Sequence, residues 1–160
     1  LDWRNINSGK IFIDEQTRKN AISLRNNLLR LAETFADEGN FEKAEEMLDL
    51  SLEKMPIKDF DHYSIALGYP EIYYQIGKQE KARKTTETII SILQQKLVWY
   101  STFDTKFNAI IISELQDILL MYKRGILEEV EMRDKDSTYV KSLQQDFMNN
   151  IKLFDHLTQE

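Results

Sequence analysis

Apolar residues recur at steps of three and four positions along most of the chain, the spacing typical of α-helices that bury one face. The first predicted helix starts after Asp14, whose carboxylate suits an N-cap, and stops at Gly39, because glycine readily adopts the left-handed conformation that closes a helix. A second helix starts near Phe41 and ends at Pro56, which predicts a helical hairpin over residues 14–55. The expected inward residues are Ala21, Leu24, Leu28, Leu31 and Phe35 in the first helix, and Ala44, Leu48, Ser51 or Leu52, and Met55 in the second.

The same periodicity predicts two more hairpins, over about residues 60–98 and 105–158. In the first of these, a short helix near 60–67 should give way to a new start or a kink at Pro70, because proline removes a backbone donor. In the second, Gly125 either ends a helix that starts near residue 106 or is tolerated within a helix that runs to Arg133. The expected inward residues are Ala82, Thr86, Ile89, Leu93 and Leu97, then Phe107, Ile111, Leu115, Ile118 and Tyr122, and finally Val140, Leu143, Phe147, Ile151 and Phe154.

No segment alternates with period two over a strand's length, so the sequence predicts an all-α fold of about six or seven helices. Residues 1–13 lack helical periodicity and are expected to form an irregular lead-in, followed by a single domain over residues 14–160. The low content of glycine and proline, 5 and 2 residues, also favours helices over a sheet with many turns.

Charge and cysteine content exclude several classes of function. The net charge is −6 with no basic patch, which argues against nucleic-acid binding. The chain has no cysteine, so disulfides, thiolate zinc sites and cysteine nucleophiles are excluded. No apolar run approaches the roughly 20 residues of a membrane-spanning helix, so this segment is not expected to insert into a membrane.

The residues that could carry chemistry form no catalytic or metal-binding pattern. His62 lies beside Asp59 and Asp61 but lacks the helical ligand spacing of a metal site, and His156 is far away in sequence. Paired carboxylates such as Glu45–Glu46 lie in charge-rich runs typical of solvated helix faces, and neither a nucleophile elbow nor a phosphate-binding glycine loop is present. The chain is therefore expected to have no catalytic residue, metal or cofactor.

One pattern repeats. Gly39 and Gly77 are 38 residues apart, and each has an aromatic residue four positions before it and an alanine five positions after it. The first copy, with Leu28, Leu31, Ala32, Phe35, Gly39, Ala44, Leu48, Ser51 and Pro56 at the signature positions, resembles a tetratricopeptide (TPR) repeat. The second copy is degenerate, since Pro70 occupies a small-residue position and Thr86 a large apolar one. The resemblance implies a TPR-like α-solenoid whose third helix pair acts as a C-terminal cap.

A second resemblance covers roughly residues 1–100. The runs IDEQTR at 13–18 and LRNNLLRLA at 24–32, the opening Asp2-Trp3, and Pro70 before 71–74 are similar to the soluble C-terminal region of a bacterial multi-pass membrane-protein family of unknown function. The membrane part of that family is similar to GT-C-type glycosyltransferases, including protein O-mannosyltransferases. The resemblance implies that this chain is a non-catalytic appendage, tethered to the inner membrane on the periplasmic side, and that catalysis belongs to a part of the protein outside it.

The TPR-like alignment also predicts a groove. Its candidate lining residues are Asn26, Leu29, Glu33, Asp37, Glu71, Tyr74 and Gln75. This set is acidic and lacks the Lys, Arg and Asn clamp with which some TPR domains hold a partner's terminal carboxylate, so a chaperone adaptor of that type is not expected. A basic or neutral protein or peptide is the expected partner, or else the membrane domain of its own parent chain.

Two alternatives stay open. A free-standing cytoplasmic TPR-like scaffold or adaptor would have the same residues, and only the reading frame upstream of Leu1 distinguishes it from a membrane-tethered appendage. The helix near 78–97 is the most basic of the chain, as helices at membrane surfaces are. Its apolar face is, however, needed for packing within its hairpin.

Overall fold

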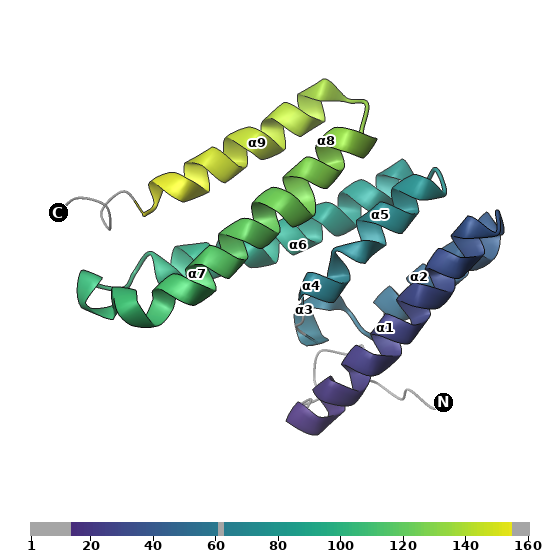
Figure 1. Cartoon of the computed structure of the whole chain (residues 1–160), viewed down its shortest axis with the longest axis horizontal. Coiled ribbons are helices and arrows are strands. Elements are labelled where there is room, and N and C mark those ends of the chain that lie inside the picture. The colour runs from purple at the N-terminus through teal and green to yellow at the C-terminus, as the bar shows by residue number, and fades with distance from the viewer. Residues whose placement is uncertain (1–13, 61–62, 155–160) are drawn as a thin grey trace. The chain divides into compact units, whose positions relative to one another are not determined.

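The computed structural model describes residues 14–60 and 63–154, and these residues form helices without any strand (Figure 1), which confirms the all-α class. No helix in this described part is long and apolar enough to cross a bilayer. The predicted lead-in at 1–13, Asp61, His62 and His156 lie outside the described residues. Contacts divide the chain into two compact units, one ending at Thr86 and one beginning at Glu87, and each is described by itself.

The first unit begins with a helical hairpin of α1 (Glu15–Asp37) and α2 (Phe41–Lys54), which pack against each other. Asp14 caps α1 as expected, since its carboxylate accepts a 2.9 Å hydrogen bond from the Thr17 amide. Two short helices, α3 (Ile57–Phe60) and α4 (Tyr63–Ala66), lead to α5 (Gly68–Gln75) and the start of α6 (Gln79–Tyr100). Because α5 begins at Gly68, Pro70 lies in its first turn, where a helix needs no amide donor.

The two glycine turns have the same hydrogen bonds. After α1, Gly39 has φ +77° and the Asn40 amide donates to the Phe35 carbonyl at 2.8 Å. After α5, Gly77 has φ +74° and the Lys78 amide donates to the Tyr73 carbonyl at 2.7 Å. Both are Schellman closures, so the sequence repeat corresponds to a repeated helix–turn–helix geometry.

Small residues set the contact between the helices of the first hairpin. Ala32 on α1 and Ala44 on α2 are completely buried, as expected, together with Leu48 and Ser51. The expectation that Leu31 points inward is wrong, because its side chain is 41% exposed. The buried stripe of α1 runs instead through Ala32 and Ala36, and one residue along a helix is turned by about 100°.

Arg25 on α1 is a buried charge of this unit, at 1% exposure. Its guanidinium donates a 2.7 Å hydrogen bond to the carbonyl of Met55, the residue that closes α2. It also lies 5.9 Å from the ring centre of Phe60, which belongs to an apolar cluster with Ala21 and Met55. The guanidinium of α1 thus caps the C-terminal end of α2.

The second unit contains the rest of α6, a 3-10 turn η2 (Thr105–Phe107), α7 (Asn108–Tyr122), a π-helical stretch η3 (Lys123–Glu128), α8 (Glu129–Arg133) and α9 (Ser137–Lys152). Gly125 lies within η3, so of the two possibilities for it the structure has a helix that continues to Arg133. Asp136 caps α9, and α9 returns alongside η3 and α8 (Figure 1). The rings of Tyr122 and Phe147 meet edge to face at 5.1 Å in the core of this unit.

Candidate functional site

The predicted groove residues on α1 lie on one side of that helix. Asn26, Leu29, Glu33 and Asp37 are spaced by three and four positions, which places them on a common face. Asn26, Glu33 and Asp37 are exposed, and Leu29 is half-buried. This face is therefore open to solvent and polar, with one apolar residue at its base.

The predicted residues on α5 come close to this face. α1 and α5 pack against each other, and the Gln75 amide donates a 2.8 Å hydrogen bond to the Asp37 carboxylate. Leu29 packs over Gly68, where an added Cβ would lie only 2.7 Å from Leu29 Cδ2. Glycine at position 68 thus permits the close approach of the two helices. Glu71 is exposed and Tyr74 half-buried on the same short helix.

The charge of these seven residues is entirely acidic. Glu33, Asp37 and Glu71 contribute three carboxylates, and none of the seven is basic. Glu71 and Tyr74 also interact with other residues of the chain. An exposed row of carboxylates and amides can accept hydrogen bonds from amino, guanidinium or backbone amide groups of a bound segment.

Lys78, directly before α6, and Lys81 within α6 form ion pairs with α2 in the same unit. Glu45 on α2 receives both Lys78 and Lys81 at 2.7 Å, and Lys81 also lies 2.6 Å from Asp49. The hydrogen bonds from Lys78 and then Lys81 hold the pKa of Glu45 below its ordinary value. Tyr73 donates a 2.7 Å bond to Asp49, and burial, with this bond, raises the pKa of its phenol. Two of the lysines that made this helix the most basic thus join α2 to the second hairpin.

Within residues 14–60 and 63–154, no three acidic or histidine side chains are grouped so that they could hold a metal ion. The histidines considered as ligands fall outside these residues.

Sequence reasoning missed a second surface feature, an apolar groove in the second unit between the α7–η3–α8 helix and α9. A signal for it is present in the sequence. α7 has apolar residues on more than one face, and of its exposed residues Ile110, Ile112 and Leu120, which are 74%, 44% and 49% exposed, Leu120 lines the groove. A helix with one buried stripe does not require this excess.

Comparison of the chain with protein families, with curated proteins and with solved structures finds no match in any of the three. The described residues thus form helices with a repeated glycine turn, an acidic face on α1 and α5, and an apolar groove beside α9.

Proposed function

We propose that the chain is a non-catalytic protein-interaction domain of TPR-like architecture that binds a basic or neutral peptide segment on the face formed by α1 and α5. The observation that carries this proposal is the repeated Schellman turn at Gly39 and Gly77, with α1 packed on α5. In TPR-like stacking the first helices of successive hairpins line one groove. α1 and α5 are these helices in the present chain.

The chemistry of the expected partner follows from the exposed groups. Three carboxylates on this face favour Lys or Arg side chains and repel an acidic segment. The amide of Gln75 already holds Asp37 at 2.8 Å, which fixes the position of one acceptor before a partner arrives. Preorganisation of this kind lowers the entropic cost of binding.

The same domain fits two settings. As the appendage of a membrane glycosyltransferase-like protein on the periplasmic side, it would bind an acceptor protein or its own membrane domain. As a free-standing cytoplasmic scaffold, it would bind other soluble proteins. Several hydrophobic spans of about 20 residues in the reading frame upstream of Leu1 would favour the first setting, and a start codon close to Leu1 the second.

A peptide array tests the recognition face with a matched pair of charge reversals. Glu33→Lys changes the α1 face, whereas Glu46→Lys changes an exposed position of α2 and leaves the same net charge. We expect the unmodified chain and Glu46→Lys to select the same Lys- and Arg-containing peptides, and Glu33→Lys to lose them. Equal selection by all three chains, or selection of acidic peptides, would refute the proposal.

Tyr74 provides a second test on the same face. Tyr74→Ala should weaken binding of the selected peptides, because it removes a ring from the recognition face. It should lower the melting temperature only slightly, because the Tyr74 side chain is only half-buried. Retained peptide binding combined with a large loss of stability would make Tyr74 a core residue and remove it from the recognition face.

A further inference from the structure

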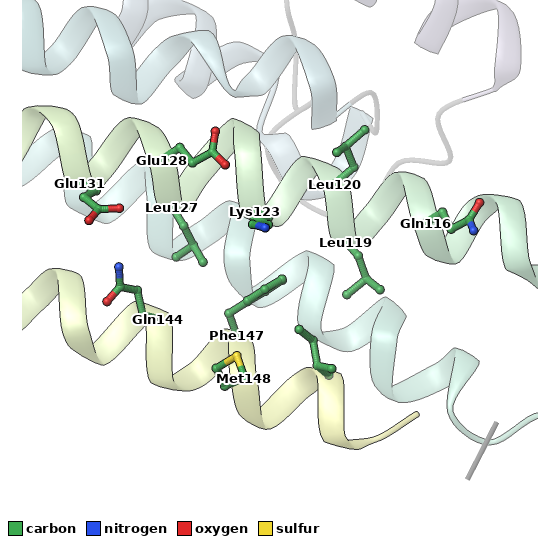
Figure 2. Close-up of a pocket in the computed structure, with 11 residues that line it drawn as sticks. Gln116, Leu119, Leu120, Lys123, Leu127, Glu128, Glu131, Gln144, Phe147 and Met148 are labelled. Carbon is green, nitrogen blue, oxygen red and sulfur yellow. The ribbon is translucent and has the colours of Figure 1, made fainter. Parts of the chain in front are cut away.

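The apolar groove of the second unit is a feature that the proposed function does not use. It has a volume of about 710 Å³ and lies between the α7–η3–α8 helix and α9. In Figure 2, Leu119 and Leu127 point toward α9, and Phe147 points back toward them. Leu120 and Met148, which also line the groove, are 49% and 51% exposed, so the groove is open to solvent.

The shape of the groove is elongated. Along the α7–α8 helix its lining runs from Gln116 to Glu131, a length of about 20 Å at the rise of an α-helix. Along α9 it runs from Gln144 to Ile151, or about 10 Å. A depression of this length between two helices matches the apolar face of a third helix, whose residues at i, i+3, i+4 and i+7 form one stripe.

The groove lining has more negative than positive charges. Glu128 and Glu131 place two exposed carboxylates at its α8 end, against the single ammonium of Lys123. The remaining polar groups are the amides of Gln116 and Gln144, which can bind either sign. The excess of negative charge at one end favours a helix with Lys or Arg beside its apolar stripe.

The backbone at the groove is also unusual. η3 is a π-helical stretch, and its residues Lys123, Leu127 and Glu128 belong to the groove lining. Such stretches are rare and occur frequently at functional sites. Here the π-helical stretch lies where Leu127 faces Phe147.

We propose that this groove binds the apolar face of an amphipathic helix from a partner protein, and that Glu128 and Glu131 contact basic residues of that helix. Leu119, Leu127 and Phe147 form the floor, and Leu120 and Met148 are the exposed apolar edges that become covered. This inference is independent of the peptide-binding face on α1 and α5, because it rests on other residues in the other unit.

The test uses the full chain and a fluorescent synthetic helix of Leu and Lys, about four turns long, in an anisotropy titration. Met148→Glu adds a negative charge to the groove, and Met132→Glu adds the same charge at an exposed methionine outside the lining. We expect Met148→Glu to weaken binding about tenfold or more and Met132→Glu to leave it unchanged within about twofold. Nonspecific attraction to an acidic chain would instead strengthen binding in both variants.

A second pair keeps the test valid if Met148→Glu disturbs folding, which far-UV circular dichroism will reveal. Leu120→Glu lies in the groove and Ile112→Glu outside it, and the two side chains are exposed to a similar extent. Only the former should weaken binding. Glu128→Gln combined with Glu131→Gln should also weaken binding and reduce its dependence on salt.

Three results would overturn the proposal. The first is equal binding by the groove variants and their controls, or no binding at all. The second is equal affinity for a Leu and Glu helix of the same apolar spacing, which would remove the role of the two carboxylates. The third is a dimer of the chain alone that Met148→Glu dissociates, since the groove would then belong to a second copy. The charge reversal Glu33→Lys should not affect binding of this helix.

Discussion

Replacing Arg25 by methionine tests whether a buried guanidinium stabilises the first unit. Methionine retains an unbranched apolar stem of similar length, so it fills most of the same space between α1, α2 and α3. It cannot donate the 2.7 Å hydrogen bond to the Met55 carbonyl, and it removes the positive charge at the C-terminal end of α2. The substitution therefore isolates the polar role of the side chain from its packing.

The magnitude follows from opposing contributions. A hydrogen bond from a charged donor stabilises a fold by about 1.5–3 kcal/mol, and a cation at a partly buried helix C-terminus by up to about 2 kcal/mol. These contributions overlap, because the same guanidinium makes both. The value for the hydrogen bond is a net one that already includes the cost of taking the guanidinium out of water, and the variant also leaves the Met55 carbonyl without its donor. We expect a net loss of about 2–3 kcal/mol in the free energy of unfolding.

Denaturant unfolding followed by far-UV circular dichroism measures this loss, with Arg30→Met as the matched control. Arg30 lies on the same helix, but its side chain is exposed, so its substitution should change stability by less than about 0.5 kcal/mol. If Arg25→Met is as mild as the control, or raises stability, desolvation outweighs the hydrogen bond and Arg25 does not stabilise the hairpin. Arg25→Lys keeps the charge but loses the planar guanidinium, so its loss of stability should lie between those of Arg25→Met and Arg30→Met.

Three further outcomes can be measured on the same chain. Gly39→Ala and Gly77→Ala should each lower the free energy of unfolding by about 1 kcal/mol in denaturant unfolding. An added Cβ has open space at both sites, so the cost comes only from the left-handed φ, and a neutral result would contradict the two Schellman turns. Thr86→Val should raise the unfolding free energy by about 1 kcal/mol, because the buried Thr86 hydroxyl has no hydrogen-bond partner among the described residues; a loss of stability would indicate a partner for it. Burial and, to a lesser extent, Asp146 raise the pKa of Tyr122 to about 12, so the stability this phenol confers is complete below about pH 10 and is lost as the pH rises toward that value. Tyrosinate absorbance should therefore rise together with the loss of circular dichroism at high pH, and full ionisation of all tyrosines in the folded chain would show that none is buried.

Local signals in the sequence were sufficient for the long helices and the two glycine turns, but the expectation that Phe107 points inward is wrong, because it lies in η2 and is 37% exposed. The period of 3.6 residues identifies each long helix, and Gly39 and Gly77 mark turns because only glycine adopts positive φ without strain. The inward stripe of α6, from Ala82 through Thr86 to Leu97, is completely buried as predicted. These features depend on residues close together in the chain, which is why periodicity and turn chemistry identify them.

Which residues meet across helices was decided by the tertiary structure. Arginine is rarely buried without a partner, and Arg25 is buried because the end of α2 presents the Met55 carbonyl beside it. Leu31 reads as a core residue, yet it is exposed because Ala32 and Ala36 allow the closer helix contact. Periodicity predicts the buried face of a helix only to within a residue or two, and packing against the partner helix decides which of these residues is buried.

The acidic face and the apolar groove also differ in how much of each the sequence alone could predict. The TPR-like alignment of the sequence named the seven candidate residues of the acidic face, but only the structure joins Asp37 to Gln75 and Leu29 to Gly68. The apolar groove depends on residues of α7, η3, α8 and α9 that are up to about 35 positions apart, and on a π-helical stretch around Gly125 for which the sequence left two outcomes open. Spacing along one helix is a property of the chain, whereas a groove between helices exists only once they have packed.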